Sequence, residues 1–226
     1  MANRTGIAAI SGVAFYLATA ASAAGSTPLA QWNMDETFGT TMHDSSGNHN
    51  DGAMKNVVTS GGGFMFNGTS SKVIVPNSAS LDPTGDFSFT VQVQTDRIPP
   101  SGGDYDVLRK GAATTIGGGY RMEIENSKGI AKAYCQVKDS LGHGASIRGK
   151  TNIADGKLHT ISCIKRSTGL TLQVDDLAPL TKTASLTGPI KNTKELVLGV
   201  KAPKATGSDA DFYYGTMRSA SMSVGQ

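Results

Sequence analysis

The sequence predicts an all-β protein, built as an antiparallel β-sandwich or jelly roll. Short segments in which apolar and polar residues alternate recur along the chain, and this period of two is typical of half-buried strands. Turn-forming residues separate these segments, and glycine, at 28 of 226 residues, is well above its average share. About a dozen short strands with a turn after each is the pattern of a sandwich.

The first residues predict a secretory signal peptide over residues 1–23. Arg4 supplies a positive charge, residues 6–20 form a short apolar run, and Ala21-Ser22-Ala23 is a small-residue cleavage site. An uncleaved anchor helix is the alternative, although the run is near the lower length limit for crossing a bilayer. Cleavage leaves 203 residues with a formal charge of +2, and we expect one exported, soluble domain over residues 24–226.

Charge argues against several classes of partner. The formal net charge is +3 and no run of Lys or Arg exceeds two residues, so we expect no nucleic-acid partner. No second apolar run approaches membrane length, so we expect no membrane contact after cleavage. The oligomeric state stays open.

The two cysteines, Cys135 and Cys163, are the only pair in the chain. In an oxidising compartment a disulfide between them is expected, while two buried free thiols are the alternative. We expect the bridge to join neighbouring strands and to stabilise the fold by roughly 3–4 kcal/mol.

The clearest candidate strand is residues 87–94, where Phe87, Phe89, Val91 and Val93 share one face. The other candidate strands, in order, lie at residues 121–125, 132–138, 159–165, 170–174 and 196–198. Turns are expected at residues 46–48, 61–63, 101–103, 117–119, 127–129 and 167–169.

Three stretches carry a resemblance to a known family. Residues 31–52 contain Q-W-N-M-D-E-T-F-G followed by D-S-S-G-N-H-N-D-G. The second stretch runs from Phe66-Asn67-Gly68 through Val73-Ile74-Val75 to the strand at 87–91. The third stretch, residues 155–175, contains D-G-K-L-H-T-I-S-C and then L-T-L-Q-V-D. In this order they resemble the laminin G-like, concanavalin A-like jelly-roll domains of secreted bacterial proteins, over residues 29–225. The resemblance implies a secreted domain that binds carbohydrate.

Catalysis on this fold would need paired carboxylates on one strand. The glucanases of the fold use the pattern E-x-D-x-x-E, and the nearest match is Glu123-Ile124-Glu125, where the last acid is missing and Lys128 stands near its place. We therefore interpret Glu123 and Glu125 as a solvated face beside Arg121, and we expect no enzyme activity.

A metal site is a further expectation from the resemblance. It implies calcium at the rim of the sandwich, with Asp35, Asp44 and Asn48 as the candidate ligands. Two departures weaken it: Gly119 and Arg218 stand where the family carries aspartates. No other cofactor is expected.

Aromatic rings are the other requirement of a sugar site. Tyr105, Tyr120, Tyr213 and Tyr214 are the candidates in exposed loops, near the acidic residues Asp104, Asp106 and Asp211. The alternative is that these rings pack at strand ends with only their hydroxyls exposed to water. The only tryptophan, Trp32, is interpreted as a core residue.

We therefore expect a secreted, non-catalytic, lectin-like module that recognises an extracellular or cell-surface carbohydrate through rim loops. A protein–protein adhesion or matrix module is the first alternative. A polysaccharide-active enzyme on the same fold is the second.

Overall fold

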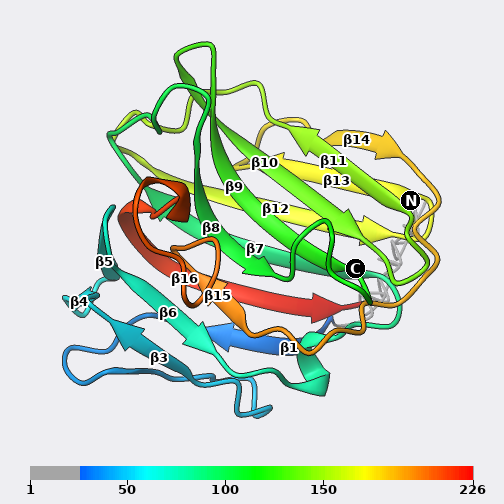
Figure 1. The fold of residues 1–226 in the computed structure, drawn as a ribbon, viewed down its shortest axis with the longest axis horizontal. Helices are drawn as coiled ribbons and strands as arrows, with labels where there is room; N and C mark the ends of the chain where they lie inside the picture. Colours follow the sequence, from blue (N-terminus) through cyan, green and yellow to red (C-terminus); the bar gives the residue numbers. More distant parts are fainter. Residues whose placement is uncertain (1–25, 226) are drawn as a thin grey trace, which may run out of the picture.

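The computed structural model describes residues 26–225, and these form two antiparallel sheets packed face to face (Figure 1). The first sheet contains β1 (Thr27–Trp32), β4 (Val58–Thr59), β5 (Phe64–Asn67), β7 (Phe87–Gln94), β12 (Leu158–Arg166), β13 (Gly169–Val174), β14 (Leu180–Thr183) and β16 (Tyr214–Val224). The second sheet contains β2 (Thr41–Met42), β3 (Gly52–Lys55), β6 (Lys72–Val75), β8 (Asp104–Lys110), β9 (Gly119–Ser127), β10 (Ile130–Lys138), β11 (Gly144–Arg148) and β15 (Leu196–Leu198). The predicted all-β, antiparallel jelly-roll sandwich is confirmed.

The strand order mixes distant parts of the chain. In the first sheet the order is β14-β13-β12-β7-β16-β5-β4, and β1 also pairs with β16. In the second sheet the order is β11-β10-β9-β8-β15-β6-β3-β2. Within the described residues, the only helices are two short 3₁₀ turns, η1 (Ala79–Leu81) and η2 (Ser208–Ala210). Neither has the length and apolar character needed to cross a membrane.

The core lies between the sheets and follows from the alternation in the sequence. Phe87, Phe89, Val91 and Val93 of β7 all point inward and are fully buried. Trp32 is also fully buried, as expected for a core residue, and its indole Nε1 donates a hydrogen bond of 2.7 Å to the Asn50 carbonyl. The apolar part of the indole thus packs in the core, while its one polar atom, Nε1, has a hydrogen-bond acceptor.

The predicted disulfide is present, although it does not join neighbouring strands. Cys135 lies on β10 in the second sheet and Cys163 on β12 in the first, with their Cα atoms 6.0 Å apart. Both cysteines occupy inward positions, so their side chains meet in the core between the sheets. The bridge is therefore a link between the two layers of the sandwich.

The predicted signal peptide at residues 1–23 lies outside the described residues.

Candidate functional site

Residues 199–213, which we call the covering segment, lie on the outer face of the second sheet. Val197 of β15 points outward and forms a small apolar cluster with Val200, Ala210 and Phe212, separate from the main core. Hydrogen bonds to β8 fix the segment near both ends. The Gly199 N–H donates to the Val107 carbonyl, and the Asp106 N–H donates to the Asp211 carbonyl. One outer face of the sandwich is therefore partly covered.

A groove of about 650 Å³ lies beside the covering segment. The glycine-rich turn at residues 100–103 and residues 68–69 form part of its wall, and Asp104, Lys201 and Asp211 contribute charged groups to it. This volume falls in the range of small-molecule sites, which combine apolar walls with a few converging polar groups.

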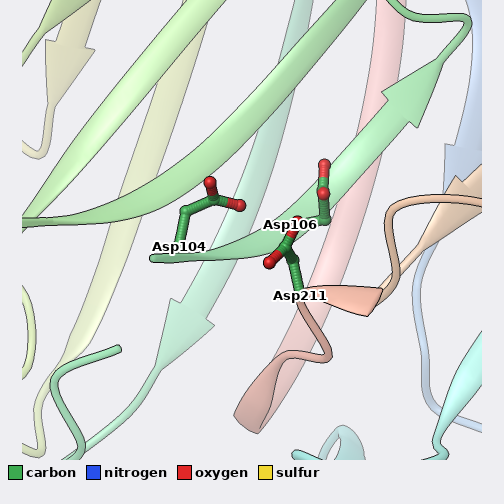
Figure 2. Close-up of side chains that lie close together, drawn as sticks. All are labelled: Asp104, Asp106 and Asp211. Carbon is green, nitrogen blue, oxygen red and sulfur yellow. The ribbon is translucent and has the colours of Figure 1, made fainter. Parts of the chain in front are cut away.

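Three carboxylates, of which Asp104 and Asp211 line the groove, lie close together beside it (Figure 2). Asp104 and Asp106 are two residues apart on β8, so they share one face, and Asp211 reaches them from the covering segment. Each offers an oxygen, and the three oxygens lie within 4.8 Å of one another. The Asp106 N–H donates to the Asp211 carbonyl at 2.9 Å, which holds the two chain segments together.

A buried ion network lies beneath these carboxylates. The Arg109 guanidinium donates to both Asp106 oxygens, at 2.6 and 2.9 Å, and to Glu123 Oε1 at 2.5 Å. Arg121 Nη1 lies 2.8 Å from the same Glu123 oxygen. A bulge in β8 between Asp106 and Leu108 turns both Asp106 and Arg109 to the outer face.

The interpretation of Glu123 as a solvated residue is wrong. Its side chain is 1% exposed, because its outward face is occupied by Arg109 and Arg121. Glu125, two residues on, is partly buried and forms an ion pair with Arg148. Glu123 is therefore enclosed by cations and cannot reach a substrate in this arrangement.

Burial shifts the protonation of these acids. Burial raises the pKa of Asp106 to about 6. Burial, together with the negative charges of Asp106 and Asp104, raises the pKa of Glu123 to about 8. Burial also raises the pKa of Asp104 above its usual value, and the nearby Asp211 adds to the rise. Asp211 itself is paired with Lys201, whose Nζ lies 2.6 Å from Asp211 Oδ2.

Asp104 also carries an unsatisfied atom. Its Oδ1 is shielded from solvent and accepts no hydrogen bond from any of residues 26–225. A shielded carboxylate oxygen without a donor costs free energy, because it has lost water and gained no partner. Because Asp104 lines the groove, its carboxylate is a group that a ligand hydroxyl or a cation could stabilise.

The three carboxylates could offer hard oxygen ligands to a divalent cation. Arg109 already occupies both Asp106 oxygens, however, and Lys201 occupies one oxygen of Asp211. A cation would have to displace or share these partners, whereas a sugar hydroxyl needs only the Asp104 oxygen.

The predicted metal ligands Asp35, Asp44 and Asn48 lie elsewhere, in the segment that follows β1. Asp44 accepts hydrogen bonds from the backbone N–H groups of Gln31, Ser46 and Asn50 and from the Ser46 hydroxyl. Although burial acts to raise the pKa of Asp44, these donors hold it below its usual value. Asn48 donates to carbonyls of the β1 strand, and Asp35 is exposed. Asp44 and Asn48 thus order a turn.

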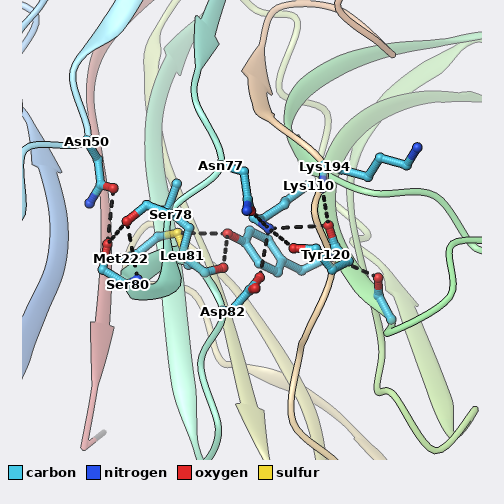
Figure 3. A network of polar contacts seen from close by, with 12 residues as sticks. Asn50, Asn77, Ser78, Ser80, Leu81, Asp82, Lys110, Tyr120, Lys194 and Met222 are labelled. Carbon is cyan, nitrogen blue, oxygen red and sulfur yellow. Dashed lines mark hydrogen bonds and ion pairs between the residues drawn. The ribbon is translucent and has the colours of Figure 1, made fainter.

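The expectation of exposed-loop tyrosines is wrong for three of the four. Tyr105 is 8% exposed, Tyr120 is 1% exposed, and Tyr213 is fully buried. The Tyr120 hydroxyl donates to the Leu81 carbonyl at 3.1 Å inside the core (Figure 3). The enclosed rings of Tyr120 and Tyr213 therefore offer no face to a sugar.

Tyr214 is only partly buried, and its ring lies under the Arg97 guanidinium, 3.6 Å from the ring centroid. The Tyr105 ring meets Tyr213 edge to face, with centroids 6.0 Å apart, and Tyr105 also lines the groove. The structure thus brings Tyr105, Tyr213 and the three acids to one place, while Tyr120 belongs to the core.

A second buried cation was also missed by the sequence analysis. Lys110 Nζ is enclosed near η1, where it donates to Asn77 and Asp82 at 2.8 and 2.7 Å and to the Asn192 carbonyl at 3.0 Å (Figure 3). It holds three chain segments together. The only signal for the groove residues was the Asp104-x-Asp106 spacing, which places both acids on one face of a strand.

No protein-family model and no curated protein sequence matches this chain. Solved structures with a similar fold include the receptor-binding domain of a botulinum neurotoxin of mosaic serotype C/D, with 13% identity, a TM-score of 0.62, and coverage of 88% of this chain and 48% of that one. A structure of botulinum neurotoxin type C, described as entering cells through interaction with two ganglioside molecules, has 14% identity, a TM-score of 0.59 and coverage of 88% and 48%.

A third similar structure is domain 4 of the extracellular arabinanase AbnA from Geobacillus stearothermophilus, in complex with arabinotriose. It has 13% identity, a TM-score of 0.60, and coverage of 88% of this chain and 92% of that one. The chain spans about half the length of the toxin structures and nearly all of the arabinanase domain. At this identity the likeness shows the fold alone, a two-sheet, jelly-roll-like β-sandwich.

Proposed function

We propose that this chain is a secreted, non-catalytic module that binds an extracellular or cell-surface carbohydrate in the groove beside the covering segment. Residues 1–23 are its signal peptide, and residues 24–226 form a single laminin G-like domain. The observation that carries the proposal is Asp104, which lines a groove of about 650 Å³ and whose Oδ1 has no hydrogen-bond donor among residues 26–225.

The chemistry of the groove suits a sugar. A carbohydrate presents hydroxyl groups that donate to a carboxylate and accept from an ammonium group, and Asp104 and Lys201 supply one of each. Tyr105 and Phe212 add apolar edges to the same wall, against which the C–H faces of a sugar ring can pack. The rigid sheet beneath fixes these groups in place, which lowers the entropy cost of binding.

Two further observations support this proposal. Two of the similar structures are described by their binding to gangliosides and to arabinotriose. The disulfide between Cys135 and Cys163 is typical of proteins in oxidising compartments outside the cytosol.

A glycan array probed with purified protein of residues 24–226 tests the proposal, followed by titration calorimetry with the bound glycan. We expect Asp104→Asn to weaken binding about tenfold or more, because a hydrogen bond to a charged group contributes roughly 1.5–3 kcal/mol. Asp176→Asn is the matched control, since this exposed carboxylate lies in the turn after β13 of the other sheet.

Two results would overturn the proposal. One is an array on which folded protein binds no glycan. The other is a glycan that binds Asp104→Asn as tightly as the unchanged protein. Mass spectrometry of the exported protein checks the signal peptide, because a mature chain that begins at Met1 contradicts cleavage.

A further inference from the structure

The outer face of the first sheet is unusual because most outward side chains of its central strands carry no charge. All four outward side chains of β7 are uncharged: Ser88, Thr90, Gln92 and Gln94. Three neighbouring segments likewise present only Ser, Thr, Gln or Ile outward: β13, the C-terminal half of β16, and β12 between its ends. Solvent-facing surfaces of globular domains are normally rich in Lys, Arg, Glu and Asp.

Among the outward side chains of β7, β12, β13 and β16, two are charged, Arg166 and Arg218. Arg166 ends β12, and Arg218 is exposed at the bulge that divides β16. An acidic polymer would therefore find no cation among the outward side chains of β7, of β13, of β12 before Arg166, or of β16 after Arg218. A neutral partner loses nothing by contact with it, because no ion has to be desolvated.

The hydroxyl groups are held in place by cross-strand hydrogen bonds. Thr90 and Ser162 lie 2.9 Å apart between their side-chain oxygens, and the Ser219 hydroxyl donates to Gln92 at 3.2 Å. Each hydroxyl has one donor and two acceptor positions, so a single cross-strand bond leaves further capacity. These bonds order the side chains before a ligand arrives, which lowers the entropy cost of binding.

The same face is hollowed along a line that crosses the strands. A depression of about 330 Å³ is lined by Gln31 of β1, Ser221 of β16, Thr90 of β7, Ser162 of β12 and Gln173 of β13. These five strands are consecutive neighbours in the sheet. With a strand spacing of about 4.8 Å, the row spans roughly 19 Å, enough for several units of an extended chain.

We propose that this outer face of the first sheet is a second binding surface, which takes an extended chain of a neutral, hydroxyl-rich polysaccharide. Its hydroxyl and amide groups exchange hydrogen bonds with the sugar hydroxyls at many points along the row. The surface lies on the opposite sheet from the groove with Asp104, so it does not depend on the function proposed for that groove.

Binding isotherms on polysaccharide beads test the proposal. The probes are arabinan, mannan and β-1,4-glucan, with polygalacturonate as the charged counterpart, each measured at low and high salt. We expect binding to at least one neutral polymer that is unchanged by salt, because no ion pair is available for screening. Ser162→Lys and Ser221→Lys should each weaken binding to the neutral polymer tenfold or more, because each places an ammonium group in the row of hydroxyl and amide side chains.

Two controls separate this surface from the rest of the molecule. Ser146→Lys makes the same change on β11, on the outer face of the second sheet, and should leave bead binding unchanged. Asp104→Asn should also leave it unchanged, which distinguishes failure of this proposal from failure of the groove. Thermal unfolding confirms that each variant is folded, and the two lysine variants serve as independent replicates.

Four results of the binding assay would overturn the proposal: no binding to any of the three neutral polymers, binding only to polygalacturonate, binding that falls as salt rises, or binding retained in both folded lysine variants. Sedimentation that detects a dimer broken by Ser162→Lys would assign the face to a second copy of this chain and would equally overturn it.

Discussion

Breaking the disulfide between Cys135 and Cys163 should lower the free energy of unfolding by about 3.5 kcal/mol. The bridge closes a loop with a sequence separation of 28 residues. In the chain-entropy model a loop of that size removes about 12 cal/mol/K from the unfolded chain, which is about 3.5 kcal/mol at 25 °C. Because the bond joins the two sheets through the core, its loss also removes a link between the layers.

Urea unfolding followed by tryptophan fluorescence measures this directly. With a slope of about 2.5 kcal/mol/M, the unfolding midpoint should fall by about 1.4 M when the protein is reduced. Reduction changes only the bond, so it isolates the loop effect from the cavity that a smaller side chain would leave. The double variant Cys135→Ala, Cys163→Ala serves as the control, since its midpoint should be the same with and without reductant.

The reasoning is refuted if oxidised and reduced protein unfold at the same urea concentration. It is equally refuted if the midpoint of the double variant responds to reductant as the unchanged protein does.

Three further predictions concern the core, the ion network and a turn. Because the pKa of Glu123 is raised in the folded protein, the folded chain keeps a proton that the unfolded chain releases, so the free energy of unfolding should fall as pH rises from about 4.5 to about 8. Glu123→Gln should make the free energy of unfolding less dependent on pH in this range. Urea midpoints that rise from about pH 4.5 to about pH 8 would contradict this prediction. Trp32→Ala should lower the free energy of unfolding by about 3–5 kcal/mol, and solvent-like emission from native Trp32 would disprove its burial. Gly117→Ala should destabilise the protein by more than about 1 kcal/mol in chemical unfolding, because φ is +88° and the new Cβ would lie 1.7 Å from the Lys191 carbonyl oxygen. Gly62→Ala should destabilise it less, because nothing lies within 4 Å of the new Cβ. Equal losses of stability in the two variants would argue against this backbone geometry.

Local alternation was enough to predict β7, β9, β10, β12, β13 and β15 and the core residues on them, whereas β8 and β16 were not among the candidate strands. The Phe87–Gln94 segment places its apolar residues inward as expected, and the cysteine pair forms its bridge. Strand order was beyond the sequence, because β15 pairs with both β6 and β8 across long chain separations, and no short-range pattern encodes those partners. Because the sequence does not reveal strand order, Cys135 and Cys163 were expected on neighbouring strands, whereas they lie on different sheets.

The site was harder to predict for a related reason. A period of two assigns residues to two faces of a strand, but it does not say which outer face another segment will cover. Glu123 was expected in solvent and is buried, because Arg109 and Arg121 enclose it. Tyr120 and Tyr213 were expected in loops, yet both are strand or strand-end residues packed in the core, as the alternative interpretation held. The bulge in β8 that turns Asp106 and Arg109 outward has no signal in the sequence.

A crystal structure of the protein with the tightest-binding glycan from the array tests the central claim most directly. We expect a sugar in the groove beside residues 199–213, with one hydroxyl within hydrogen-bonding distance of the Asp104 carboxylate. A short glycan bound elsewhere on the molecule, with no sugar contact to Asp104, would contradict it.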